Sequence, residues 1–130
     1  MSAGLVLVVE DNQLNRRLVK DVLCHAGYGV LEAESAEEGI ALAQEHLPSL
    51  VLLDIQLPGG MDGLEAVKVL KHDDKTESIP VVAVTAFAME DDRERALVAG
   101  FDGYLEKPVN IDALRAEVTR FVPLEEVEND

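Results

Sequence analysis

Cysteine, aromatic side chains and positive charge are all scarce in this sequence. The single cysteine, Cys24, excludes an internal disulfide and fits a reducing compartment, and we expect it to be a small buried hydrophobe. With two tyrosines, three phenylalanines and no tryptophan, the core must be built mostly from Val, Leu, Ile and Ala. The chain has 11 basic and 26 acidic residues, and the resulting net charge of −15 argues against binding to nucleic acid.

Long apolar runs are also missing. The longest uncharged apolar stretch, residues 79–89, is too short to cross a bilayer as a helix and contains Pro80. Residues 1–4 lead straight into a five-residue apolar run, so we expect no signal peptide. We therefore expect a soluble, cytoplasmic protein with no membrane contact.

Short apolar runs, by contrast, alternate regularly with helical patterns. Strands are expected at 5–9, 29–33, 50–53, 81–84 and 103–105. Helices are expected at about 13–26, from the N-cap at Ser35 to 46, from the end of a glycine-rich loop at 58–63 to about 72, at 90–99, and from Asn110 or Asp112 to 121. This alternation demands a parallel sheet with right-handed crossovers and helices on both faces. The predicted fold class is α/β, a (βα)5 doubly wound, five-stranded parallel sheet of the flavodoxin-like type, for which the strand order 2-1-3-4-5 is typical.

These elements fill residues 1–122, which we expect to form one domain without a linker. Residues 123–130 begin with a proline and carry four acidic side chains, so we expect a frayed, solvated tail. Within the first expected helix, Leu14, Leu18 and Val22 fall near one face, which is typical of an amphipathic helix.

Acidic side chains follow two of the buried strands, at the edge where parallel sheets bind ligands. Glu10 and Asp11 follow the first strand, and Asp54 follows the third. Three carboxylates at one edge would repel one another, and Mg²⁺ would remove that conflict because it prefers oxygen ligands. We expect Asp11 and Asp54 to be direct ligands and Glu10 to act through water. Solvent-exposed acids that cap the strand ends are the alternative.

Asp54 is the expected nucleophile for a phosphoryl group. Attack on phosphorus needs mostly alignment and charge neutralisation, which Mg²⁺ and the ammonium of Lys107 would supply. Thr85, at the end of the fourth strand, could donate its hydroxyl to the same oxygens. A plain surface lysine is the alternative for Lys107, and the bond to Pro108 is a candidate for a cis peptide.

This constellation resembles the receiver domain of two-component response regulators. The similarity rests on five segments in the family's order and spacing, which are 8–12 (VVEDN), 52–58 (LLDIQLP), 61–65 (MDGLE), 80–86 (PVVAVTA) and 103–108 (GYLEKP). The resemblance covers about residues 4–122, nearly the whole chain. The stretch 80–89, with Glu10-Asp11-Asn12 and Asn15, is most similar to stand-alone regulators of the DivK type, and also to receivers attached to hybrid histidine kinases.

The resemblance implies a chemistry for the acidic edge. Asp54 would receive phosphate from a phosphohistidine on a histidine kinase or a histidine phosphotransfer protein. Glu10 and Asp11 would hold Mg²⁺ together with Asp54, and the backbone carbonyl of Gln56 would be a further ligand. The protein would then be no enzyme in the ordinary sense, since only its own phosphorylation and dephosphorylation would be catalysed.

The resemblance also implies a switch. Thr85 would move to meet the phosphate, Lys107 would pair with it, and the side chain of Tyr104 would follow. The face formed by the helix at 90–99, the strand at 103–105 and the last helix would then change and bind a downstream protein effector. A monomer or a weak homodimer is expected.

Two departures from the family pattern stand out. Most members carry a second aspartate where this chain has Glu10, and the extra methylene could alter the water shell of the metal. The loop 58–63 is one residue longer than the commonest pattern because of an added glycine. Both features leave the lifetime of the phosphorylated form open.

Other classes of protein compete with this interpretation. An interaction module of the same fold that never takes phosphate would be expected to lack part of the acidic pocket, Thr85 or Lys107. A flavin-binding protein would need a phosphate-cradling loop after the first strand, where this chain is acidic. A phosphatase with an aspartate nucleophile would carry it on the first strand, whereas Asp54 follows the third.

Overall fold

Five strands and five helices alternate along the chain in the computed structural model, which describes residues 4–86 and 90–123. The strands are β1 (Leu5–Val9), β2 (Gly29–Ala33), β3 (Leu50–Asp54), β4 (Val81–Thr85) and β5 (Gly103–Glu106). The helices are α1 (Gln13–His25), α2 (Ala36–His46), α3 (Gly63–His72), α4 (Glu90–Ala99) and α5 (Ile111–Phe121). Most of these bounds lie within one residue of those expected from the sequence. Residues 124–130 of the acidic tail expected at 123–130 lie outside the described residues.

All five strands are parallel and form one sheet in the order β2-β1-β3-β4-β5. The predicted α/β fold and strand order are therefore confirmed. Every residue of β3 and β4 is buried, which explains why these strands are continuous apolar runs rather than alternating ones. Among the described residues, no helix has both the length and the apolar character needed to span a membrane.

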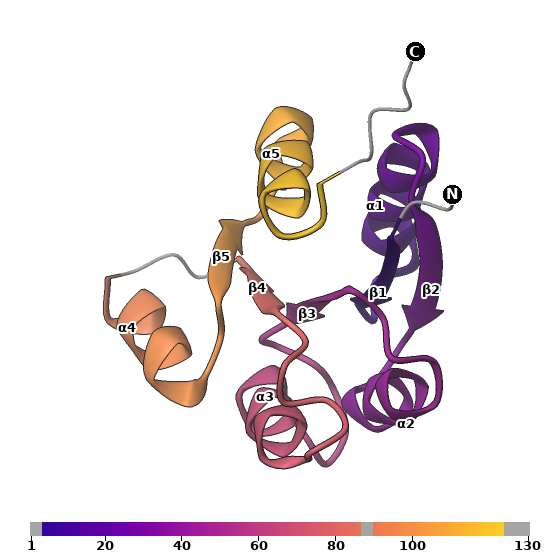
Figure 1. Cartoon of the computed structure of the whole chain (residues 1–130). Helices are drawn as coiled ribbons and strands as arrows, with labels where there is room; N and C mark the ends of the chain where they lie inside the picture. The colour runs from indigo at the N-terminus through magenta and orange to yellow at the C-terminus, as the bar shows by residue number, and fades with distance from the viewer. Residues whose placement is uncertain (1–3, 87–89, 124–130) are drawn as a thin grey trace.

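Helices cover both faces of the sheet, so the molecule has three layers (Figure 1). Helices α1 and α5 pack on one face, where Leu23 and Leu114 join the core formed by alternate residues of the central strands. Helices α2, α3 and α4 pack on the other face, where Ala43, Val67 and Ala96 contribute to a second cluster. Each face of a central strand is thus buried against a helix, as a doubly wound sheet requires.

The buried face of α1 differs from the one that the sequence suggests. Leu14 and Leu18 are 79% and 46% exposed, whereas Val19 and Leu23 are buried. Cys24 is exposed, so the expectation of a buried cysteine is wrong. Both errors have one cause, because a helix with several apolar residues can pack through more than one face, and only the contact with the sheet selects it.

The start of α3 holds the end of β3 in place. Asp62 caps the helix by accepting a hydrogen bond from the backbone N–H of Glu65, and the Glu65 carboxylate accepts one from the backbone N–H of Asp62. Gly63 lies directly against the strand, since a Cβ there would come within 2.6 Å of the Cα of Ile55 and collide with the backbone of Asp54. The lengthened loop before α3 contains Gly59 with a φ of 96°, a conformation that favours glycine.

Candidate functional site

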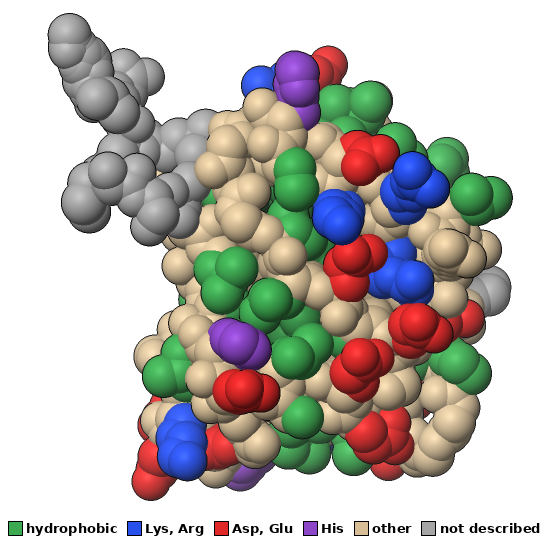
Figure 2. Space-filling view, turned by 90° about the vertical axis from the view of Figure 1, so that its right-hand side faces the viewer, with side chains coloured by type: hydrophobic (Ala, Val, Ile, Leu, Met, Phe, Trp, Pro, Cys, Tyr) green, Lys and Arg blue, Asp and Glu red, His purple; other side chains and the backbone are tan. Residues whose placement is uncertain are grey.

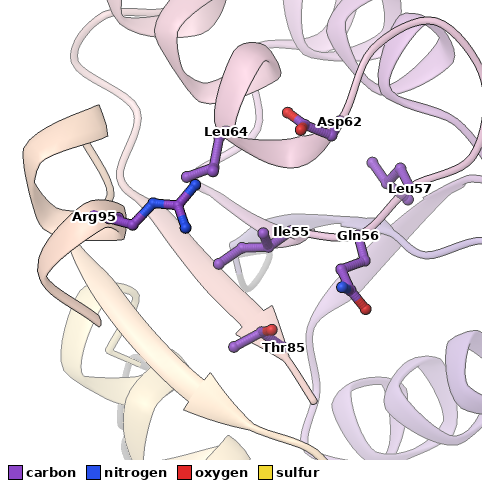
Figure 3. Close-up of a pocket in the computed structure, with 7 residues that line it drawn as sticks. All are labelled: Ile55, Gln56, Leu57, Asp62, Leu64, Thr85 and Arg95. Carbon is purple, nitrogen blue, oxygen red and sulfur yellow. The ribbon is translucent and has the colours of Figure 1, made fainter. Parts of the chain in front are cut away.

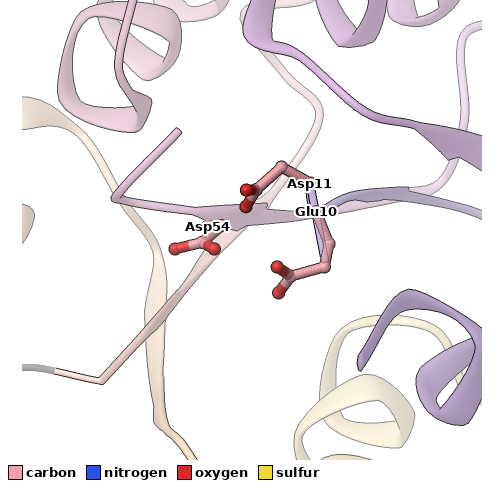
Figure 4. A group of neighbouring side chains, drawn as sticks. All are labelled: Glu10, Asp11 and Asp54. Atoms are coloured by element: carbon pink, nitrogen blue, oxygen red, sulfur yellow. The ribbon is translucent and has the colours of Figure 1, made fainter. Parts of the chain in front are cut away.

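Three carboxylates lie together at the carboxyl edge of the sheet. Strands β1 and β3 are neighbours in register, with Val9 opposite Leu53, so the residues that follow them come side by side. One oxygen from each of Glu10, Asp11 and Asp54 lies within 4.8 Å of the other two. Figure 4 shows the three side chains converging from the ends of the two strands.

This cluster is partly buried. Glu10 and Asp54 are 5% and 3% exposed, while Asp11 is open to solvent. Burial raises the pKa of Glu10 above its ordinary value, although hydrogen bonds from Lys107 and the backbone N–H of Asn12 oppose that shift. A compact set of carboxylate oxygens with one open side is the donor set that Mg²⁺ takes in proteins. The residues present therefore fit a magnesium ion.

Lys107 reaches into the same cluster from the end of β5. Its Nζ lies 2.8 Å from Oδ2 of Asp54 and 2.8 Å from Oε1 of Glu10. The backbone N–H of Lys107 donates to the carbonyl of Thr85 at 2.8 Å, and the bond to Pro108 is cis. Burial lowers the pKa of Lys107, but the hydrogen bonds with Asp54 and Glu10 outweigh that effect and raise it. The lysine is therefore charged, and its ammonium contacts two of the three clustered carboxylates.

Thr85 and Gln56, which the sequence predicts to belong to the site, lie beside Asp54. Thr85 is the buried last residue of β4, one position beyond the residue that pairs with Asp54 in the sheet. The backbone N–H of Gln56 donates to Oδ1 of Asp54 at 2.9 Å. Thr85 and Gln56 line a cavity of about 510 Å³, and Figure 3 shows Arg95 of α4 and Asp62 on its wall.

Tyr104, the second residue of the predicted switch, lies on β5 and is half-buried. The guanidinium of Arg93, on α4, stands 5.2 Å from the centre of its ring, within the range of a cation–π contact. Tyr104 therefore connects β5 to α4 on the predicted effector face.

Sequence reasoning missed Arg16. Its side chain is 11% exposed, and Nη1 donates to the backbone carbonyl of Glu10 at 2.9 Å. The signal was present in the helical spacing, since Arg16 lies three residues before Val19 and seven before Leu23, on the buried face of α1. It was overlooked because an arginine is rarely assigned to a buried face.

The structure thus brings Glu10, Asp11, Asp54 and Lys107 into one cluster and places Thr85 at its margin. The roles of these residues, the metal contact of the Gln56 carbonyl and the movement of Tyr104 stay predictions.

Comparison with known proteins adds an independent finding. Residues 6–119 match the family model described as the response regulator receiver domain. The polar-differentiation response regulator DivK of Brucella anthropi is 46% identical over 106 residues, which cover 82% of this chain and 85% of that protein. Chemotaxis protein CheY4 of Vibrio cholerae has a similar structure, with a TM-score of 0.87 and 27% identity over 93% of this chain and 100% of that one. The receiver domain of a sensor histidine kinase from Pseudomonas aeruginosa, described with a magnesium ion coordinated in its active-site cleft, matches with a TM-score of 0.85 and 29% identity over 92% and 98% of the two chains.

Proposed function

The chain belongs to the response regulator receiver family of two-component signalling, and from that premise we propose that Asp54 is its phosphoacceptor. The observation that carries this proposal is the position of Asp54, buried at the end of β3 with Lys107 at 2.8 Å and two further carboxylates beside it. A phosphohistidine on a histidine kinase or a phosphotransfer protein is the donor. Its P–N bond breaks as a bond forms between phosphorus and a carboxylate oxygen of Asp54, and the imidazole leaves.

Each neighbouring side chain has a part in that transfer. Glu10, Asp11 and Asp54 would hold Mg²⁺, with the Gln56 carbonyl as a further ligand, and the ion would supply positive charge beside the phosphoryl oxygens. Lys107 supplies a second positive charge from the other side. Charge neutralisation and alignment account for most of the catalysis that phosphoryl transfer needs. The chain therefore promotes its own phosphorylation and dephosphorylation and is no enzyme towards other substrates.

The phosphoryl group is read through the face formed by α4, β5 and α5. Thr85 lies between Asp54 and this face, and Tyr104 lies on it against Arg93. Movement of Thr85 towards the phosphate frees space into which Tyr104 turns, so a local change of charge biases two arrangements of the surface.

Apolar side chains on the same face support its use by a protein effector. Leu97 of α4, one turn after Arg93, is 54% exposed, and Ile111 of α5 is 48% exposed. The exposed Leu14 and Leu18 of α1 offer apolar surface beside the site for the donor protein. We place this chain in the cytoplasm, as a monomer or weak homodimer that does not bind nucleic acid, with the receiver over 1–122 and the acidic tail over 123–130.

Intact-mass measurement tests the proposal directly. With Mg²⁺ and acetyl phosphate as a small phosphodonor, the wild type should gain one phosphoryl group and Asp54→Asn should gain none. Asp102→Asn is the matched control, because it removes a carboxylate at the other edge of the sheet and should label like the wild type. Chelation of Mg²⁺ should slow labelling of the wild type by about 100-fold or more, since a metal supplies several kcal/mol of charge stabilisation. Equal labelling of the wild type and Asp54→Asn would remove Asp54 from its role.

A further inference from the structure

Arg16 connects the acidic cluster to the edge strand of the sheet. Besides its bond to the Glu10 carbonyl at 2.9 Å, its Nε donates to Oε1 of Glu32 at 3.3 Å, and its Nη2 lies 3.9 Å from Oε2 of Glu34. Glu32 lies on β2 and also pairs with Lys20, one turn further along α1, at 3.2 Å. Figure 2 shows the face that carries α1 and β2, on which basic and acidic side chains are interspersed.

The Glu10 carbonyl lies at a sensitive place. A peptide unit is planar, so an atom that fixes the Glu10 carbonyl also fixes the direction in which the chain leaves towards Asp11. The backbone N–H of Glu10 donates a hydrogen bond to the carbonyl of Ala33 at 3.0 Å, and the Glu10 carboxylate accepts one from the backbone N–H of Asn12 at 3.1 Å. Arg16 completes this set by holding the peptide between two of the three clustered carboxylates.

The contacts of Arg16 favour a geometric role over an electrostatic one. Its network contains two basic side chains, Arg16 and Lys20, and two acidic ones, Glu32 and Glu34, so their charges sum to zero. Because this network is neutral, it has little effect on the electrostatic potential at the acidic cluster. The planar guanidinium can bond a carbonyl and a carboxylate at once because its donors point in fixed, divergent directions.

We propose that Arg16 is a positioning residue that sets the orientation of the Glu10–Asp11 peptide for metal binding. This inference rests on the proposed function, since it concerns the same site. Arg16 acts through the backbone of Glu10 and touches neither the metal nor the phosphoryl group. Groups that orient metal ligands commonly contribute a factor of about 10–100 to metal affinity.

A pair of variants separates the effect of the hydrogen bond from Arg16 to Glu10 from the effect of its positive charge. Arg16→Met removes the bond to Glu10 and one positive charge beside Glu32, while Lys20→Met removes one positive charge beside the same Glu32 and leaves the bond intact. Binding of Mg²⁺ to the unphosphorylated proteins is followed by backbone amide NMR shifts. Labelling by acetyl phosphate is then measured over a range of Mg²⁺ concentrations, which separates the half-saturating concentration from the maximal rate.

Arg16→Met should need about tenfold more Mg²⁺ for half-saturation in both measurements, with a maximal labelling rate within about threefold of the wild type. Lys20→Met should stay within about twofold of the wild type. Arg16→Lys keeps the charge without the planar fork and should fall between the two. If Arg16→Met does not fold, Arg16→Lys alone tests the inference, and it should weaken Mg²⁺ binding by at least about threefold.

Unchanged Mg²⁺ affinity in a folded Arg16 variant would overturn the inference, and so would equal weakening by Lys20→Met, which would point to charge alone. Failure of the proposed function looks different. In that case the wild type itself would take up neither Mg²⁺ nor phosphate.

Discussion

The two edges of the sheet, where the parallel strands begin and where they end, each hold a lysine beside acids, and they differ in how the charges balance and in how deeply the acids are buried. At the amino edge, Lys71 Nζ lies 2.8 Å from Oδ2 of Asp102 and donates to the carbonyl of Ile79 at 2.8 Å. The same Asp102 oxygen accepts from the backbone N–H of Val81 at 2.9 Å. One cation meets one carboxylate there, and the surrounding polar atoms have partners.

At the carboxyl edge, a single ammonium lies against two buried carboxylates, with Asp11 as a third within reach. Burial makes this imbalance costly, because charges that water cannot screen interact more strongly. The lysine at the amino edge therefore serves stability, whereas the lysine at the carboxyl edge leaves negative charge that a divalent cation can neutralise. A lysine beside an acid indicates function only where the acids outnumber it.

The largest expected difference between the two edges is in how much a Gly→Ala substitution lowers the free energy of unfolding. At the carboxyl edge, Gly63→Ala should lower the free energy of unfolding by roughly 3 kcal/mol, because the new Cβ collides with the backbone of Asp54 and Ile55. At the amino edge, Gly100 has a φ of 121° and its neighbour is the flexible side chain of Lys71. Gly100→Ala should therefore cost less, about 1–2 kcal/mol. Urea denaturation measures both. Gly60→Ala is the control and should stay within about 0.5 kcal/mol, since its surroundings are open.

A larger loss at Gly100 than at Gly63 would mean that backbone conformation at the amino edge, rather than contact with Asp54, limits stability.

Removal of each lysine should sharpen the comparison. Lys71→Met should lower the free energy of unfolding by about 1–2 kcal/mol whether or not Mg²⁺ is present, since it removes the donor to the Ile79 carbonyl and leaves Asp102 only the backbone N–H of Val81. Lys107→Met should destabilise by a similar amount without Mg²⁺ and recover most of the loss at millimolar Mg²⁺, because the ion replaces the missing charge. Thermal unfolding with and without Mg²⁺ measures the difference. If Mg²⁺ rescued both variants equally, the two edges would not differ in charge balance.

Lys107 should also be needed for the switch. Lys107→Ala should still bind Mg²⁺ but lose most of the amide shift changes in β5 that phosphorylation produces in the wild type, because the phosphoryl group then lacks its ammonium partner. Backbone NMR of the phosphorylated proteins measures this, with Lys71→Ala as the control that keeps the changes. Full shift changes in Lys107→Ala would show that another cation couples the site to β5.

The smallest expected effect concerns alkaline pH. The pKa of Lys107 is raised above its ordinary value of 10.5 in the folded state, although burial alone would lower it. A raised lysine pKa means that the stabilisation is fully present below the unfolded pKa and disappears as the pH rises through the folded pKa. The wild type should therefore lose more of its free energy of unfolding than Lys107→Met as the pH rises above 10.5. The free energy of unfolding of both proteins is measured against pH. An equal loss in the two proteins would show that the pKa of Lys107 is not raised in the folded state.

Much of this protein could be predicted from local pattern. The fully buried strands β3 and β4 are apolar runs that end at Asp54 and Thr85, so the sequence alone assigns these polar residues to the carboxyl edge. The capping residue Ser35 marks a helix start in the same local way. The family resemblance added the expected roles, which the geometry of the cluster supports.

The helix faces were predicted less well. Leu14 and Leu18 form an apolar stripe that the fold leaves exposed, while Arg16 occupies the buried side of the same helix. Local periodicity cannot choose between two faces that differ by one residue step of about 100°. The exposed Cys24 has the same origin, since it follows the buried Leu23 by one step.

The sequence by itself determined the order of the elements, the class of the sheet and the gathering of acids at one edge, because short-range periodicity and the geometry of parallel strands require them. Only the tertiary structure decided which side of α1 meets the sheet, how Lys107 bridges Asp54 and Glu10, and that Arg16 holds the peptide between the acids. These contacts join residues that lie on different elements, and their geometry depends on how whole helices and strands pack. That packing is a property of the complete fold, which no local stretch of residues specifies.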